Sequence, residues 1–247
     1  MPQGRGTTTT GNHQQPVAGR VLYSRRADNA GWLDVKLSDG RRVSVSEYVR
    51  VIFLRQENGR IYYRIDDEGC EYNGWEASSN ETTLNRYWVT EPPTVDNYII
   101  RVKYLPSSIE RSVVRNQDLM HEWGRLAVDG RDIRVTLNTQ PGRGYAPIPV
   151  GTHKILRPDR SHANIPTTGY VNHVTNSLGG TCYGNDTWFP IEVGGQITSR
   201  YVHIGHWSDG CVTVYELEAW SHIYDYLINK RQGSIRSKYT ADLIVEP

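Results

Sequence analysis

Residues 201–214 read YVHIGHWSDGCVTV, and the rest of the chain can be interpreted outward from this stretch. The β-prone run at 201–204 precedes turn-forming residues at 205–210, which predicts a strand that ends near His203 and then bends. The bend leads directly to Cys211. The stretch therefore predicts a cysteine presented at the end of a strand.

A helix is expected immediately after this cysteine. Thr213 and Glu216 have the spacing of a capping box, in which each side chain satisfies a free backbone N–H at the start of a helix. Apolar residues then recur at helical spacing, at Leu217, Trp220, Tyr224, Leu227 and Ile228. The helix should end near residues 230–233, and Cys211 should lie two residues before its cap.

Such a position favours a reactive thiolate. Free N–H groups and the positive end of the helix dipole lower the pKa of a nearby cysteine. We therefore expect Cys211 to titrate below an ordinary cysteine. The backbone N–H groups of Asp209, Gly210 and Cys211 would stabilise an oxyanion beside the sulfur, with Ser208 shaping the site.

The nearby histidines complete a Cys/His pair for acyl transfer, with His203 as the expected base and His206 as the alternative. Candidate substrate-binding residues flank them at Arg200, Tyr201 and Trp207. The competing interpretation makes Cys211 a small buried hydrophobic residue and both histidines structural. This stretch alone leaves both interpretations open.

Two motifs carry a family resemblance. Residues 208–212, SDGCV, resemble the Ser/Thr-X-Gly-Cys signature of the L,D-transpeptidase catalytic domain, the YkuD-like family. Residues 146–155, APIPVGTHKI, resemble the TPxGxF segment of that family and stand in the family's order. The family's usual histidine stands further upstream than His203, and Thr213 stands where the family often has arginine. The resemblance covers roughly residues 120–247.

The resemblance implies a β-sandwich enzyme that needs no cofactor or metal. Its thiolate attacks a peptidoglycan stem peptide at the carbonyl before a terminal D-residue and forms a thioester acyl-enzyme. An amine acceptor would complete an L,D-transpeptidase reaction, and water an L,D-carboxypeptidase reaction. Alternatives are a secreted or phage-associated cell-wall effector using the same thiol, with a delivery or immunity partner, and a non-catalytic wall-binding or structural module.

Composition narrows the classes of partner. The 247 residues carry 28 Lys and Arg against 27 Asp and Glu, a net charge of +1 that argues against nucleic-acid binding. No apolar run is long enough for a membrane span, and residues 1–16 show no Sec-type signal. Action on the wall, in the periplasm or outside the cell, would then require a specialised export route.

The remaining cysteines and histidines give no clear site. Three cysteines are too few for a disulfide scaffold, and the sequence leaves open whether Cys70 and Cys182 pair. Four residues in the C-terminal half lack the short spacing typical of metal ligands: His153, His162, His173 and Cys182. We therefore expect no metal site.

The turn signals predict a mainly β protein in two parts. Residues 1–16 are expected to be a disordered tail, 17–105 a small antiparallel β module, and 106–247 an L,D-transpeptidase-like β-sandwich with a few helices that folds alone. The dipeptides Asp39-Gly40 and Asn58-Gly59 predict hairpins in the module. A short helix at 108–116 should connect the parts, and 158–190 should wall the Cys211 site. Candidate sugar-stacking residues in the module are Tyr72, Trp75 and Trp88.

Overall fold

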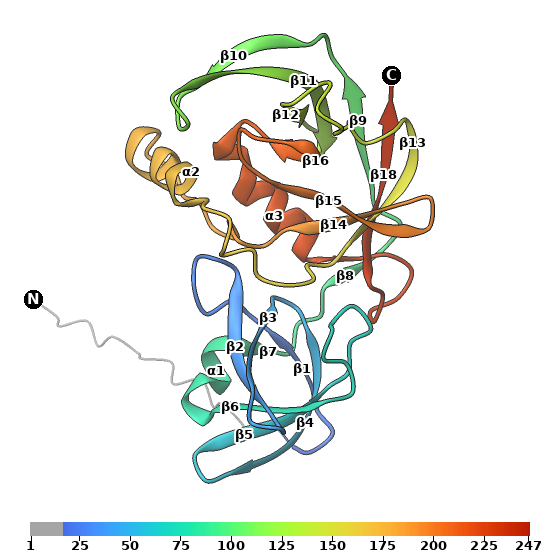
Figure 1. The fold of residues 1–247 in the computed structure, drawn as a ribbon. Coiled ribbons are helices and arrows are strands. Elements are labelled where there is room, and N and C mark those ends of the chain that lie inside the picture. The colour runs from blue at the N-terminus through green and yellow to red at the C-terminus, as the bar shows by residue number, and fades with distance from the viewer. Residues whose placement is uncertain (1–16) are drawn as a thin grey trace, which may run out of the picture.

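The computed structural model describes residues 17–247, so the tail predicted at 1–16 lies outside the described residues. The protein is mainly β, as predicted, with two large sheets arranged end to end and a two-stranded sheet beside them (Figure 1). The N-terminal module, drawn in blue, lies beneath the larger C-terminal sheet. Within residues 17–247, no helix has the length and apolar character needed to cross a bilayer.

The N-terminal module is a seven-stranded sheet in which every neighbouring pair is antiparallel, in the order β3-β2-β6-β5-β4-β1-β7. Its strands are β1 (Val21–Ser24), β2 (Trp32–Leu37), β3 (Arg42–Ser46), β4 (Arg50–Glu57), β5 (Arg60–Ile65), β6 (Glu76–Asn80) and β7 (Trp88–Val89). A 3-10 turn (Glu81–Thr83) and α1 (Leu84–Tyr87) precede β7. Asn58 and Gly59 have φ of 50° and 72°, which confirms a primed hairpin turn between β4 and β5.

The aromatic side chains of the module do not form a stacking platform. Trp88 is 5% exposed and packs against Tyr63 with ring centroids 4.5 Å apart, so it is a core residue and its proposed stacking role is wrong. Tyr72 is half-buried against the same core. Trp75 is exposed, and the Arg41 guanidinium lies 5.3 Å from its ring centroid.

The C-terminal sheet closes on itself. Its order is β10-β11-β12-β16-β15-β14-β13-β18-β9, and β9 also pairs with β11, which completes a barrel with β10 attached outside. The strands are β9 (Ile99–Tyr104), β10 (Ser108–Ser112), β11 (Gln117–Val128), β12 (Arg131–Asn138), β13 (Gly151–Leu156), β14 (Phe189–Val193), β15 (Gln196–Ile204), β16 (Asp209–Val214) and β18 (Tyr239–Glu246). β8 (Thr94–Val95) pairs with β17 (Lys230–Arg231) beside this barrel.

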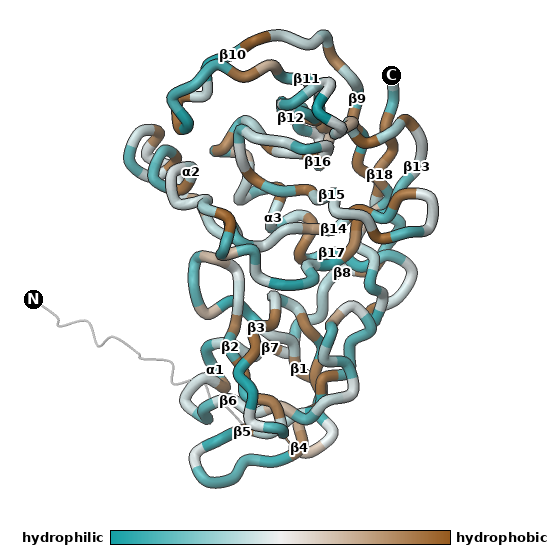
Figure 2. The backbone as a smooth tube through the Cα atoms, in the orientation of Figure 1, coloured by the Kyte–Doolittle hydropathy of each residue, from teal (hydrophilic) through white to brown (hydrophobic). Residues whose placement is uncertain are grey.

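Helices complete the C-terminal core. α3 (Trp220–Ile228) follows a 3-10 turn (Leu217–Ala219) and buries Trp220, Ile223, Tyr224 and Leu227 against the strands. α2 (Thr168–Asn172) continues into a π-helical turn (His173–Ser177) at one side of the barrel. Apolar positions in the strands and in α3 face this shared interior, as the brown segments of Figure 2 indicate. The predicted apolar stripe of α3 is confirmed.

The connection between the two sheets differs from the prediction. Residues 108–116 do not form a helix, because β10 pairs antiparallel with β11, with Ile109 opposite Met120. Strand pairing has overridden a local capping pattern. β9, assigned from sequence to the module, lies between β18 and β11. The change of sheet therefore falls between Val89 and Ile99, before the boundary expected near residue 105.

The junction between the sheets buries polar groups from both. Asp67 of the module and Arg157 after β13 form an ion pair in which both side chains are almost fully buried. Tyr224 of α3 donates a hydrogen bond of 2.8 Å to the buried Glu47 carboxylate. Separating the halves would expose an apolar surface and leave these groups without partners, so we expect neither half to retain its full stability alone.

Candidate functional site

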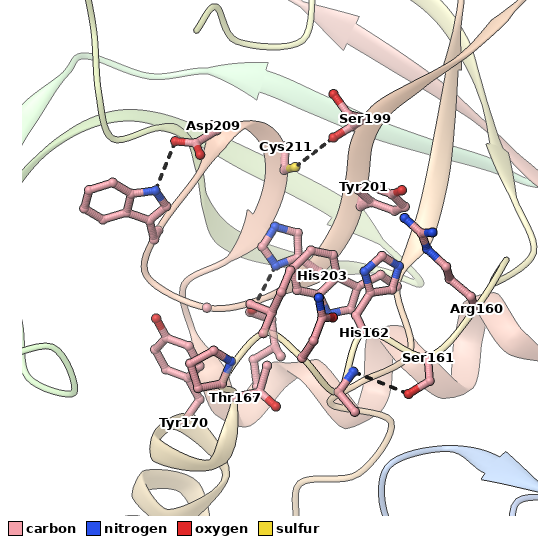
Figure 3. A pocket seen from close by; sticks show the side chains of 18 of the residues that line it. Arg160, Ser161, His162, Thr167, Tyr170, Ser199, Tyr201, His203, Asp209 and Cys211 are labelled. Atoms are coloured by element: carbon pink, nitrogen blue, oxygen red, sulfur yellow. Dashed lines mark hydrogen bonds between the residues drawn. The ribbon is translucent and has the colours of Figure 1, made fainter. Parts of the chain in front are cut away.

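A pocket of about 880 Å³ opens on the C-terminal barrel and contains Cys211. Its walls come from the ends of β15 and β16 with the turn between them, the segment 160–167, Tyr170 of α2, Trp188, and Arg115 of the β10–β11 turn. Figure 3 shows Cys211 and Tyr201 at one end of the pocket, Thr167 and Tyr170 at the other, and His203 between them. Segment 160–167 lines the cavity as predicted for a wall, although 168–177 are helical.

The register of two parallel strands brings the predicted reactive residues together. β15 and β16 pair with His203 opposite Thr213 and Val202 opposite Val212. Because side chains alternate along a strand, Val202, Ile204, Val212 and Val214 enter the core, while Tyr201, His203 and Cys211 line the pocket. Cys211 and His203 thus share one face of one strand pair.

The position of Cys211 corrects the prediction about its reactivity. Thr213 lies inside β16 and the helix begins only at Leu217 or Trp220, so Cys211 is not beside a helix N-terminus. Glu216 accepts the Arg134 backbone N–H instead of capping a helix. Thr213 and Glu216 resembled a capping box by their spacing alone. The parallel pairing with β15 extends β16 through Thr213 to Val214.

Burial dominates the chemistry of the thiol. Cys211 is 7% exposed, and its Sγ lies 3.9 Å from the Ser199 carbonyl oxygen. Loss of hydration raises the pKa of Cys211 to about 11, although a hydrogen bond from the Tyr201 backbone and the charge of Arg200 act in the other direction. The thiol is therefore neutral near pH 7, contrary to the expected lowered pKa.

Gly210 sits at an irregularity that shapes this end of the pocket. The β12–β16 register shifts between the Asn138–Asp209 and Thr136–Thr213 pairs, so β16 bulges there. Gly210 has φ of +97°, and a Cβ at this position would overlap the Ala146 carbonyl oxygen. Only glycine fits both the conformation and the close approach.

The two residues before Gly210 hold the bulge. The Ser208 hydroxyl donates to the Cys211 carbonyl oxygen at 2.9 Å, and the Ser208 N–H donates to Thr139. The Asp209 carboxylate accepts hydrogen bonds of 3.0 Å from both Trp207 Nε1 and Gln140 Nε2. These contacts give Ser208 and Asp209 a role in fixing the backbone around the cysteine.

His203 is buried, neutral and fixed in one tautomer. Its Nδ1–H donates to the Ile204 carbonyl at 2.9 Å, and its Nε2 accepts from the Thr213 hydroxyl at 3.0 Å. Burial lowers the pKa of His203 to about 4. The ring therefore has an unprotonated Nε2, which accepts the hydrogen bond from Thr213.

His206 lies in a different environment and does not line the pocket. Its ring nitrogens contact the Ser112 hydroxyl at 2.8 Å and the Tyr215 carbonyl at 3.2 Å, and its ring stacks on Tyr215. Burial lowers the pKa of His206 to about 4. These contacts favour a structural role for His206, which leaves His203 as the candidate base.

Two aromatic rings from the predicted wall 158–190, those of Trp188 and His162, form a stack with His203. The Trp188 indole stacks with the imidazoles of His203 at 4.1 Å and His162 at 4.4 Å. Tyr201 meets His162 edge-on at 4.9 Å. We call the rings of His162, Trp188 and His203 the His162–Trp188–His203 ring stack. Their wide separation in sequence gave no local signal.

Two arginines line the pocket, together with the Asp209 carboxylate. Arg115, at the tip of the β10–β11 hairpin, lies over the Trp207 ring at 4.9 Å, and Arg160 lines the opposite wall. Neither is among the arginines that pair with carboxylates in residues 17–247. The candidate Arg200 lies behind Gly210 and donates to the Ala146 carbonyl at 3.3 Å. Two unpaired arginines favour an anionic ligand.

Neither Cys70 nor Cys182 lines the pocket. Cys70, Cys182 and Cys211 are free thiols, so no Cys70–Cys182 disulfide forms. Burial raises the pKa of both Cys70 and Cys182 to about 11. In the described part of the chain, no group of three or more His, Cys, Asp or Glu side chains is placed to hold a metal ion.

Comparison with known proteins finds no relative: no protein-family model, curated protein or solved structure matches the chain. The resemblance to L,D-transpeptidases rests on residues 146–155 and 208–212. What the pocket does must be inferred from its own geometry.

Proposed function

We propose that the protein is a cysteine acyltransferase of the L,D-transpeptidase type that acts on peptidoglycan stem peptides. One observation carries the proposal: Cys211 and His203 face the same 880 Å³ pocket from adjacent parallel strands. A nucleophile and a base on neighbouring rigid strands can be held in reacting geometry without a flexible loop.

The proposed reaction begins from a neutral pair. As Cys211 Sγ bonds to the substrate carbonyl carbon, its proton passes to His203 Nε2 and the carbonyl oxygen becomes an oxyanion. Collapse of this intermediate breaks the C–N bond, and His203 returns the proton to the departing amine of the D-residue. An amine acceptor or water then releases the thioester and restores the thiol.

The charge of the pocket supports a peptide substrate with free carboxylates. Arg115 and Arg160 are exposed and unpaired at the pocket walls, and Arg groups bind carboxylates through paired N–H donors. Trp207 and Tyr201 add apolar surface between them. A stem peptide ending in a carboxylate matches this combination.

Release of the terminal D-residue tests the proposal. Purified protein is incubated with a stem tetrapeptide, with and without an amine acceptor, and products are separated by liquid chromatography and mass spectrometry. We expect a tripeptide or a cross-linked product from the wild type and neither from Cys211→Ala. Equal product from both proteins, or none from either, would contradict a Cys211-dependent reaction.

A second candidate is a non-catalytic cell-wall-binding module. It is favoured by the buried thiol with its raised pKa and by Thr213, which occupies His203 Nε2. Such a module would bind a stem peptide with equal affinity in the wild type and Cys211→Ala and release no D-residue. Calorimetric titration beside the product assay separates the two candidates.

The substrate also sets the expected setting of the protein. A stem peptide is reached in the periplasm or outside the cell, so the proposal includes export by a specialised route. A wall effector using this thiol would require an immunity partner in the producing cell. The export route and the immunity partner both follow only if the substrate is a stem peptide.

A further inference from the structure

The N-terminal module touches the back of the pocket through one turn. Residues 28–32, between β1 and β2, contact the segment 184–188 that leads into β14. Three hydrogen bonds join them: Gly184 N–H to the Asn29 carbonyl at 2.6 Å, Thr187 Oγ1 to the Ala30 carbonyl at 2.9 Å, and Trp32 Nε1 to the Asp186 carbonyl at 3.4 Å. Thr187 is fully buried at this contact.

Gly31 shows how closely the two segments approach. Its φ is +103°, and a Cβ added there would overlap Thr187 Oγ1 and approach Gly184 Cα at 3.2 Å. A side chain at position 31 would push the turn away from 184–188. The contact is therefore a fitted surface with no room for a side chain.

The opposite side of 184–188 carries the pocket. The Asp186 carbonyl also accepts the His162 N–H at 3.0 Å, and the Asp186 carboxylate accepts the Thr167 hydroxyl at 2.8 Å. Trp188 follows at once and stacks with His162 and His203. The carbonyl of Asp186 thus links Trp32 of the module to the pocket wall.

A second anchor holds the start of the same wall. Arg157, which precedes 160–167, forms its buried ion pair with Asp67 of the module. Gly69 leaves room for the Arg157 side chain, because a Cβ there would lie 2.9 Å from its Cδ. The module therefore contacts the wall at two places, through Arg157 before His162 in the sequence and through the segment 184–188 that supports His162.

We propose that the N-terminal module is a positioning element of the pocket, in which the turn 28–32 holds 184–188 and thereby sets the His162–Trp188–His203 ring stack beside Cys211. The inference rests on the proposed function only in taking this pocket as the reaction site.

The physical consequence concerns water. A wall held closely over Cys211 and His203 keeps both desolvated, and burial is the main cause of the raised pKa of the thiol and the lowered pKa of the imidazole. A loosened wall admits water, so both pKa values should move back toward their ordinary values. A contact that only stabilises the fold would lower the melting temperature without this shift.

The test compares Thr187→Val with Thr187→Ser in the full-length protein. Valine removes the hydroxyl that donates to Ala30, whereas serine keeps it. The measurements are the pH dependence of Cys211 alkylation by iodoacetamide, mapped by peptide mass, and hydrogen exchange of residues 161–167. We expect Thr187→Val to shift the alkylation profile about one pH unit lower, roughly a tenfold faster reaction at pH 8, and to speed exchange of the His162 amide. Thr187→Ser should match the wild type.

A second pair makes the result independent of folding at position 187. Trp32→Phe removes the indole donor to Asp186 and keeps an aromatic ring, while Trp75→Phe makes the same change on an exposed face of the module. Trp32→Phe should behave as Thr187→Val does, and Trp75→Phe as the wild type. If Thr187→Val does not fold, the alkylation profile and the exchange rates of Trp32→Phe decide the test.

Unchanged alkylation profiles and unchanged exchange in Thr187→Val and Trp32→Phe would overturn the inference, even if both variants melted at lower temperature. Alkylation needs no substrate, so the test is separate from the proposed reaction. A shifted profile in a protein that releases no D-residue would leave the positioning role standing and remove the enzymatic one.

Discussion

At the residue scale, the Cys211–His203 pair differs from a preformed thiolate–imidazolium pair. Burial raises the pKa of the thiol to about 11 and lowers that of the imidazole to about 4, so both are neutral near pH 7. The sulfur becomes nucleophilic as it loses its proton, and this step needs an acceptor. We propose His203 Nε2 as that acceptor, with the Thr213 hydroxyl moving aside.

Substitution of the histidines tests this assignment. We expect His203→Ala to reduce D-residue release by at least about 10²-fold, the usual cost of removing an acid–base group. His206→Ala should retain most activity but melt at lower temperature, because it loses contacts to Ser112 and Tyr215. Activity and melting temperature are measured on both. A folded His206→Ala without activity beside an active His203→Ala would reverse the roles.

The sequence predicted that Cys211 and His203 lie close together, because strand and turn signals are local, and both line one pocket. It could not place Trp188 or His162 beside them, since no spacing rule joins residues on separate strands and loops. The pKa of Cys211 was also beyond its reach. Desolvation depends on burial, and tertiary contacts between distant segments determine how far Cys211 is buried.

At the element scale, the bulge in β16 determines how the strand presents Cys211. Extra residues between the Asp209 and Thr213 pairs bend the strand, and Gly210 provides the positive φ. The sequence marked this region as a turn before a helix. Strand and turn residues were recognised, but the parallel pairing with β15 that extends β16 to Val214 is a long-range contact.

Alanine at the bulge gives a matched test of that geometry. Gly210→Ala must accept an unfavourable φ and a Cβ against the Ala146 carbonyl, while Gly195→Ala, with φ of +81°, meets nothing within 4 Å. We expect Gly195→Ala to cost about 1 kcal/mol in the free energy of unfolding and keep activity. Gly210→Ala should cost more and lose D-residue release. Urea unfolding and the product assay provide both measurements, and equal behaviour of the two variants would contradict a special role for the bulge.

At the scale of the whole molecule, buried polar contacts join the two large sheets. A mainly β fold and the hairpin at Asn58-Gly59 were predictable because alternation and turn chemistry are short-range signals. The closure of the barrel by β9 and the buried Asp67–Arg157 pair were not, because each joins distant segments. A chain starting near residue 106 would lack β9 and leave Arg157 without its partner.

Acid should destabilise the whole molecule. His121, His203 and His206 are buried and neutral, and burial lowers the pKa of each from 6.5 to about 4. The unfolded chain therefore binds protons more readily than the folded one. The histidine contribution to the free energy of unfolding is fully present above about pH 6.5 and is lost as the pH falls toward 4. Each histidine can remove up to about 3 kcal/mol by this linkage. Urea unfolding at pH 7.5, 6, 5 and 4.5 should show a steep fall, and a flat profile would show that these rings are hydrated.

The covalent intermediate is the most direct test of the central claim that Cys211 is an acylating nucleophile. Intact-mass spectrometry after incubation with a carbapenem or a stem tetrapeptide, followed by peptide mapping, locates any adduct. We expect one added acyl group on the peptide containing Cys211, absent in Cys211→Ala and strongly reduced in His203→Ala. An unmodified wild-type mass at saturating reagent, or an adduct on Cys70 or Cys182 instead, would contradict it.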